Sequence, residues 1–87
     1  MDDDTSRAHA RERTKIGRAV REVREERGLS EREVADAVRG ISLAGLRAIE
    51  AGTAMRSLDY ERFFRLARAL GVEPGALMRR ADRVEAE

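Results

Sequence analysis

The sequence predicts a compact all-α domain of four or five helices, with two short helices and a tight turn between them at its centre. Apolar residues recur at intervals of three and four along most of the chain, which is the spacing of one buried helix face. Serine or aspartate stands before several of these stretches and glycine after them, as at the ends of helices. Charged residues make up 40% of the sequence, so most of them fit exposed helix faces.

The size of the chain, 87 residues, fits a single domain with a small core, to which self-association would add stability. The sequence contains no cysteine, which excludes a disulfide framework and a cysteine zinc site and fits the reducing cytoplasm. No apolar run approaches the roughly 20 residues of a membrane span, and the N-terminus lacks an apolar signal region. We therefore expect a cytoplasmic protein without a membrane partner.

The first helix is clearest from Thr14 onward, where apolar residues mark one face before Gly28 ends it. These residues are Ile16, Ala19, Val20 and Val23. Gly17 lies inside this helix at a cost of about 1 kcal/mol relative to alanine, so we expect close packing against a neighbouring helix. Residues 1–10 are expected to be an N-terminal arm that is either disordered or extends the helix, and the domain proper is expected to span residues 11–78.

Ser30 and Glu33 predict the start of the next helix, over residues 31–39. Their spacing is that of a capping box, in which the serine hydroxyl and the glutamate carboxylate each bind the other residue's backbone amide. Gly40 is expected to end this helix in the left-handed conformation that follows many helices. The apolar stripe of the helix consists of Val34, Ala35 and Val38.

A second short helix is predicted over residues 43–51, after a turn of about three residues. Ser42 is its expected N-cap and Gly52 its expected end. Leu46 and Ile49 are expected to face the core. The residues expected to face outward are Leu43, Ala44, Arg47, Ala48 and Ala51.

Two further helices complete the prediction. Asp59 is the expected cap of a helix that Gly71 closes, and its apolar positions are Tyr60, Phe63, Leu66, Ala67 and Leu70. Pro74, in a first helical turn, and Leu77 indicate a short fifth helix. A charged tail over residues 79–87 follows it.

An ordered series of short motifs runs through these helices. The residues that carry it are Leu29, Ser30, Val34, Ala35, Gly40, Ile41, Ser42, Leu46, Ile49, Glu50 and Gly52, followed by Phe63, Leu66, Ala67, Leu70, Gly71 and Val72. In this order they resemble the phage-repressor-like (Cro/XRE) helix-turn-helix family, whose pattern runs L-S-Q-x-x-L-A, G-V-S, I-x-x-I-E-x-G and L-x-x-L-A-x-x-L-G-V. The resemblance covers residues 13–78 and rests on the whole series, because no single motif is specific.

The resemblance implies a repressor-like DNA-binding domain that regulates transcription and inserts the helix of residues 43–51 into the major groove of double-stranded DNA. The residues that would face the groove are Leu43, Ala44, Gly45 and Arg47. Of these, Arg47 alone can make a bidentate contact with guanine, whereas Leu43 and Ala44 can touch a thymine methyl group. The expected contacts to the DNA backbone come from Ser42, Arg32, Arg39 and Arg56.

The distribution of charge gives modest support to a DNA partner. The net charge is +1 overall, but it is −2 over residues 1–10, +4 over residues 11–70 and −1 over residues 71–87. Most of the arginines, taken singly, are better explained as solvated helix surface paired with nearby glutamates. The basic excess of the central segment is therefore more informative than any one residue.

Glu31 departs from the family pattern, which commonly has glutamine at this position. An ionised carboxylate cannot donate a hydrogen bond to a phosphate and repels it, which argues against strong DNA binding. An acidic residue in a first helical turn also has a structural explanation, since it complements the helix dipole. The alternative function is therefore a protein-interaction module of the same fold, with a polymerase factor, a toxin or another regulator bound to the apolar surface of residues 43–51 and weak or no DNA binding.

Phe64 lies off the main apolar face of its helix, and an exposed aromatic side chain suggests a covering surface. A second subunit would supply one, and the resulting homodimer would match two DNA half-sites about one turn apart. The loop of residues 52–58 is the equally good alternative. Leu43 likewise either contacts a base or packs on a partner or the loop, and a protein partner would use the surface of Leu43, Phe64 or Met55.

No group of residues predicts catalysis, a cofactor or a metal site, so we expect no enzyme. His9 is the single histidine and lies in a polar terminal stretch, which makes a histidine base or ligand a poor interpretation. Glu50 belongs to the I-E-x-G motif, and we expect it to bind an arginine or backbone amides of neighbouring turns. The acidic residues 2–4 are best explained as a solvated tail.

Overall fold

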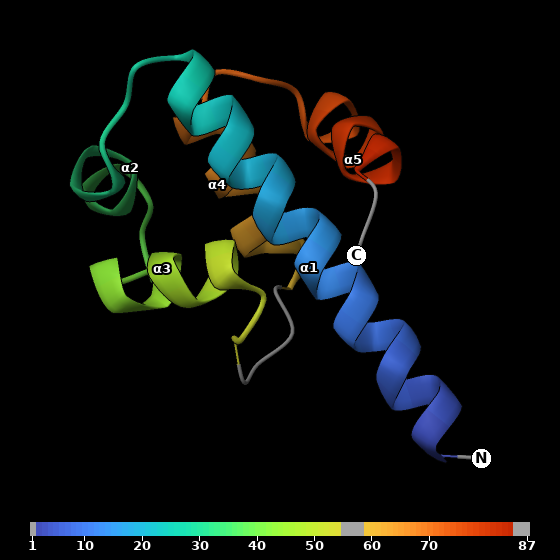
Figure 1. The fold of residues 1–87 in the computed structure, drawn as a ribbon. Coiled ribbons are helices and arrows are strands. Elements are labelled where there is room, and N and C mark those ends of the chain that lie inside the picture. Colours follow the sequence, from blue (N-terminus) through green and yellow to red (C-terminus); the bar gives the residue numbers. More distant parts are fainter. Residues whose placement is uncertain (1, 55–58, 85–87) are drawn as a thin grey trace.

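The computed structural model describes residues 2–54 and 59–84, with side chains from residue 10 onward. Five helices and no strand occur in these ranges (Figure 1). They are α1 (Asp2–Glu26), α2 (Glu31–Ala37), α3 (Leu43–Ala51), α4 (Tyr60–Ala69) and α5 (Pro74–Arg83). The predicted all-α class is confirmed.

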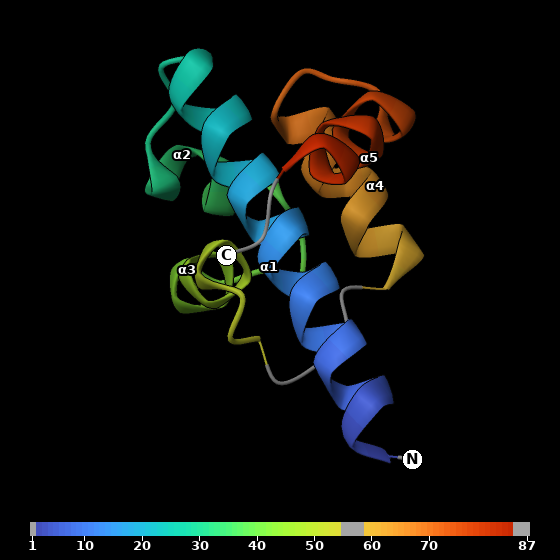
Figure 2. The ribbon, with the colours of Figure 1, turned by 45° about the vertical axis from the view of Figure 1, so that its right-hand side comes forward.

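The long helix α1 is the element around which the others are arranged. It packs against α3 and against α5, while α2 packs on α3 and α4, and α4 packs on α5. In both views the N-terminal part of α1 extends beyond the other helices (Figures 1 and 2). Residues 2–10 thus continue the backbone of α1, and its C-terminal half forms the centre of the domain.

One hydrophobic core joins all five helices. The largest side chains that are fully buried are Val20 of α1, Val34 of α2, Leu46 of α3, Leu66 and Leu70 at α4 and Leu77 of α5. Removing each such side chain from water contributes on the order of 1.5–3 kcal/mol. Ala81 and Val84 are buried in the same cluster, so the expected boundary at residue 78 lies inside α5 and residues 79–84 belong to the domain.

Side-chain caps fix the starts of three helices as predicted. The Ser30 hydroxyl accepts a bond from the Glu33 amide at 3.0 Å, and the Glu33 carboxylate accepts one from the Ser30 amide at 2.9 Å. The hydrogen bond that the Ser30 amide donates to the carboxylate, followed by the contribution of the Ser30 side chain, lowers the pKa of Glu33. The Ser42 hydroxyl caps α3 through the Gly45 amide at 3.0 Å, and Asp59 caps α4 through the Arg62 amide at 2.8 Å.

The predicted end of α2 and the predicted burial of Tyr60 are wrong. Helix α2 ends at Ala37 rather than at residue 39, because Val38 adopts an extended conformation (φ −110°, ψ 115°) that keeps its side chain in the core while the chain turns. Gly40 has the positive φ expected of it, 85°, but in the turn rather than at the helix end. Tyr60 does not join the apolar face of α4, because it is the first residue after the cap and is 77% exposed.

The first and last helices are also joined by an ion cluster. The Arg80 guanidinium of α5 donates to Glu26 at 2.5 and 2.9 Å and to Glu22 at 3.4 Å, both on α1. The bond from Arg80 lowers the pKa of Glu26. Because the three side chains remain 32–55% exposed, the cluster orients α5 more than it stabilises the domain.

Gly17 is the point of closest approach between α1 and α3, as its place within a helix predicted. A Cβ atom at this position would lie 2.1 Å from the carbonyl oxygen of Ile49 and 2.9 Å from that of Glu50. No side chain fits between two backbones at these distances, so glycine is required for the contact.

Replacing Gly17 by alanine should therefore lower the free energy of unfolding by about 1–3 kcal/mol, because α1 and α3 must separate. The same change at an unhindered helical position raises it by up to about 1 kcal/mol. Urea denaturation of the purified chain measures the difference. Gly75→Ala in α5 is the matched control, because its Cβ would meet only the flexible end of Arg79 at 3.4 Å. A Gly17→Ala variant as stable as this control would contradict the close contact.

Candidate nucleic-acid interface

Helix α3 presents a face of small side chains with one cation among them. Ala44, Arg47 and Ala51 are exposed and Ala48 is half-buried, while Leu46 on the opposite side is fully buried. The predicted bounds of this helix, 43–51, are those observed, and Gly52 ends it with a φ of 73°. The turn and the core therefore hold this face outward.

Leu43 does not face outward, contrary to the prediction. Its side chain is half-buried and packs against the core cluster. As the first residue of α3, it lies next to the turn that joins α3 to α2, where the core reaches the surface. Neither a base contact nor a partner is needed to explain an apolar residue in this position.

The Arg24–Glu50 ion pair attaches α3 to α1. Arg24 donates to the two carboxylate oxygens of Glu50 from Nε at 2.7 Å and from Nη2 at 3.1 Å, and its Nη1 donates to the Leu29 carbonyl oxygen at 2.9 Å. The two side chains are only 12% and 6% exposed. The bond to Glu50 raises the pKa of Arg24, although burial opposes it. The predicted structural role of Glu50 is confirmed.

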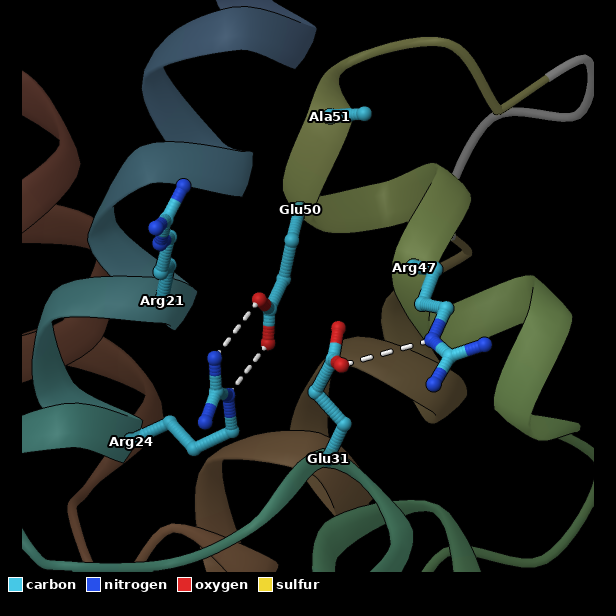
Figure 3. A pocket seen from close by; sticks show the side chains of 6 residues that line it. All are labelled: Arg21, Arg24, Glu31, Arg47, Glu50 and Ala51. Carbon is cyan, nitrogen blue, oxygen red and sulfur yellow. Dashed lines mark hydrogen bonds and ion pairs between the residues drawn. The ribbon is translucent and has the colours of Figure 1, made fainter.

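Arg47 is held by Glu31 in the same region. Its Nε donates to Oε1 of Glu31 at 3.3 Å, with 61% of the arginine side chain and 32% of the glutamate side chain exposed. Both residues line a hollow of about 280 Å³ between α1, α2 and α3, together with Arg21, Arg24, Glu50 and Ala51 (Figure 3). The hollow brings Arg47, predicted to read a base, next to Glu31, predicted to oppose phosphate.

Of the arginines predicted to hold the DNA backbone, the two within the described residues, Arg32 and Arg39, do not line a common hollow. Arg32 is exposed on α2. Arg39 lines a second hollow of about 450 Å³ with Arg65 and Arg68 of α4 and two alanines, Ala37 and Ala69. Arg56 lies outside the described residues, as do Met55 and Leu58.

Arg65 and Arg68 were not singled out in the sequence. Both occupy the polar positions of α4, where their spacing of three is typical of any exposed helix face. Arg65 is bonded to Glu61 of its own helix. Only the packing of α4 beside the end of α2 brings them to Arg39, so the sequence carried no signal for this grouping.

Phe64 is half-buried and partly covered by its own helix. The Arg68 guanidinium lies 4.8 Å from the centre of its ring, and the Tyr60 ring lies 6.1 Å away. These contacts remove part of the exposed aromatic surface from which a second subunit was inferred.

Comparisons with family models and with solved structures each match most of the chain. Residues 20–77 match the family model described as Helix-turn-helix. Among solved structures, the clp gene regulator ClgR from C. glutamicum superimposes with a TM-score of 0.73 and 28% sequence identity. That alignment covers 82% of this chain and 88% of the other. No curated protein sequence matches the chain significantly.

Removing the guanidinium of Arg24 should destabilise the whole domain. Arg24→Ala leaves the nearly buried Glu50 carboxylate uncompensated, so we expect a loss of about 3 kcal/mol in the free energy of unfolding. Replacing both residues, Arg24→Met with Glu50→Leu, should recover part of this loss, because no buried charge remains. Urea denaturation of the three proteins measures both effects.

Arg21→Ala provides the control for that experiment. Arg21 also pairs with a glutamate, Glu25, at 3.3 Å, but the two side chains are 63% and 55% exposed. Its removal should change the stability by no more than about 0.5 kcal/mol. If Arg24→Ala were equally mild, the pair would not be what holds α3 in place.

Proposed function

The chain belongs to the helix-turn-helix family and is a DNA-binding transcriptional regulator, and we propose that it recognises a specific duplex sequence by inserting α3 into the major groove. The observation that carries this proposal is the outward face of α3, where Arg47 stands among Ala44, Ala48 and Ala51. Small side chains allow the helix to approach the base edges closely. The buried Leu46 and the Arg24–Glu50 pair keep this face turned to solvent.

Arg47 is the proposed base-reading residue. An arginine can donate two parallel hydrogen bonds to O6 and N7 of guanine, which is the commonest specific contact in the major groove. Its exposed pair with Glu31 contributes little free energy and involves Nε, so the terminal nitrogens can bind a guanine. Ala44 is the proposed apolar contact to a thymine methyl group.

Backbone contacts are proposed for the polar groups around α3. Ser42 directly precedes α3, and Arg32 is exposed on α2. The serine hydroxyl and the arginine guanidinium can each bind a phosphate. Arg39 would act together with Arg65 and Arg68, because these three arginines line one hollow. Arg56 is proposed as a further contact to the DNA backbone from its position in the sequence alone.

A homodimer is proposed as the binding form, because helix-turn-helix domains of this kind bind paired half-sites. Apolar groups available for contact on α4 and α5 include the exposed Tyr60, the half-buried Phe64 and the 41% exposed Met78. We place the protein in the cytoplasm and assign it no catalytic role, as the family implies. No helix among the described residues is long and apolar enough to cross a bilayer.

The second candidate function, a protein-interaction module, is favoured by the same alanine-rich face of α3. A helix face with one donor among three alanines carries little sequence information and suits an apolar partner as well as a groove. The two functions differ in how their binding depends on salt.

Arg47→Ala should relax the sequence preference of the protein. With duplexes selected from a randomised library, we expect a loss of about 1–3 kcal/mol at one base pair and little change on random duplex. Arg32→Ala, a matched loss of one exposed arginine, should weaken binding to selected and random duplexes alike. Fluorescence anisotropy on both duplexes separates the two patterns. Equal losses on the two duplexes for Arg47→Ala would remove it from the base-reading role.

A salt titration distinguishes the regulator from the interaction module. The logarithm of the binding constant for duplex DNA falls by roughly 0.9 per neutralised phosphate for each tenfold rise in salt. Three or four phosphate contacts would therefore weaken binding by about 40- to 150-fold between 50 and 200 mM salt. A change of less than about threefold would favour the interaction module.

A further inference from the structure

Glu31 lies between the guanidinium groups of two different helices. Figure 3 shows its carboxylate between Arg24, which reaches from α1, and Arg47, which reaches from α3. Oε1 of Glu31 accepts the hydrogen bond from Nε of Arg47 at 3.3 Å. The Glu31 charge also acts on Arg24, whose pKa is raised first by the Glu50 hydrogen bond and, less strongly, by the charges of Glu50 and Glu31.

The backbone of Glu31 and the side chain of its neighbour Arg24 are both held in place. Its backbone is the first residue of α2, where the Ser30–Glu33 capping box holds the chain. Its cationic neighbour Arg24 is nearly buried and cannot move, because it is bonded to both oxygens of Glu50 and to the Leu29 carbonyl oxygen. Glu31 therefore offers its carboxylate to Arg47 from a fixed backbone position and beside a fixed cation.

Glu31 binds Arg47 at Nε and not at a terminal nitrogen. A guanidinium has one N–H at Nε and four more on its two terminal nitrogens. Glu31 takes the Nε–H of Arg47, and the terminal pair is the one that matches O6 and N7 of guanine. The contact with Glu31 therefore does not compete with end-on recognition of a base.

We propose that Glu31 is a positioning residue, which holds the Nε edge of Arg47 so that its terminal nitrogens point at a guanine. This role rests on the proposed function of α3. The free arginine side chain has many rotamers, and orienting one of them before binding reduces the entropy lost on contact. Glu31 would thus be a determinant of specificity rather than only a source of repulsion.

The placement of Glu31 also explains how the domain tolerates a carboxylate where relatives of the family have glutamine. Glu31 pairs with Arg47 as Glu50 pairs with Arg24, so the two carboxylates and two guanidinium groups balance in charge. The remaining cost is a weaker attraction for any phosphate backbone, whatever the base sequence. Glu31 should therefore lower general affinity for DNA while it raises the discrimination made by Arg47.

The experiment compares Glu31→Ala with the parent chain of 87 residues on duplexes selected by the parent from a randomised library. A good bidentate contact discriminates roughly 5- to 150-fold between base pairs. We expect Glu31→Ala to reduce this ratio about three- to tenfold at the base pair whose preference Arg47→Ala abolishes, and to bind random duplex as well as the parent or better. In the Arg47→Ala background, Glu31→Ala should have no further effect at that base pair.

Two further variants separate positioning from charge. Asp36→Ala removes one exposed carboxylate from the same helix without touching Arg47, and it should leave the preference unchanged. Glu31→Gln keeps an acceptor oxygen for Nε and should retain most of the preference. A glutamine variant that falls as far as the alanine variant would overturn hydrogen bonding as the cause.

The proposal fails if Glu31→Ala keeps or increases the preference, which would mean that Glu31 merely competes for Arg47, or if Asp36→Ala has the same effect. Its failure can be told from that of the proposed function. If Arg47→Ala itself loses no preference, or if the parent selects no sequence, α3 does not read bases through Arg47, and Glu31 then has no such side chain to position.

Discussion

The attachment of α3 to α1 is the constraint on which the rest of this structure depends. A helix of nine residues is not stable alone in water, so α3 exists because it is packed. Three contacts hold it: the backbone approach at Gly17, the burial of Leu46 and the ion pair of Arg24 with Glu50. The first two supply close packing, and the third fixes the rotation of α3 about its axis.

Burying the Arg24–Glu50 ion pair costs free energy of desolvation, so its position between α1 and α3 indicates a structural role. Two desolvated charges stabilise a fold only when their geometry is good, and an apolar pair of similar volume often does as well. In this domain the pair has both carboxylate oxygens satisfied, and the third nitrogen of Arg24 closes the turn at Leu29. An apolar substitute would keep α3 near α1 but would specify neither its orientation nor the chain entering α2.

This arrangement extends directly to the proposed recognition surface on α3. The row Glu50, Arg24, Glu31 and Arg47 alternates in charge and passes from the interior of the domain to the exposed face of α3. Burial decreases along the row, so the inner pair is structural and the outer pair remains available to a ligand. A surface with a single donor and three alanines has little capacity for direct readout. The geometry of that donor, which we propose that Glu31 sets, consequently matters more than in a domain with several polar side chains on this helix.

The sequence by itself determined the helices and the motif, because the signals involved are local. Caps such as Ser30, Ser42 and Asp59 act on amides three residues away, and the periodic apolar residues mark one face of a helix without reference to any other. It also indicated that Gly17 and Glu50 contact neighbouring elements, since a glycine within a helix suggests close packing and a carboxylate within the motif requires a partner. Only the tertiary structure decided which neighbours they have. That Leu43 packs inward, that Arg39 joins two arginines of α4 and that Glu31 meets Arg47 sixteen residues away depends on how helices cross, and no local pattern encodes this.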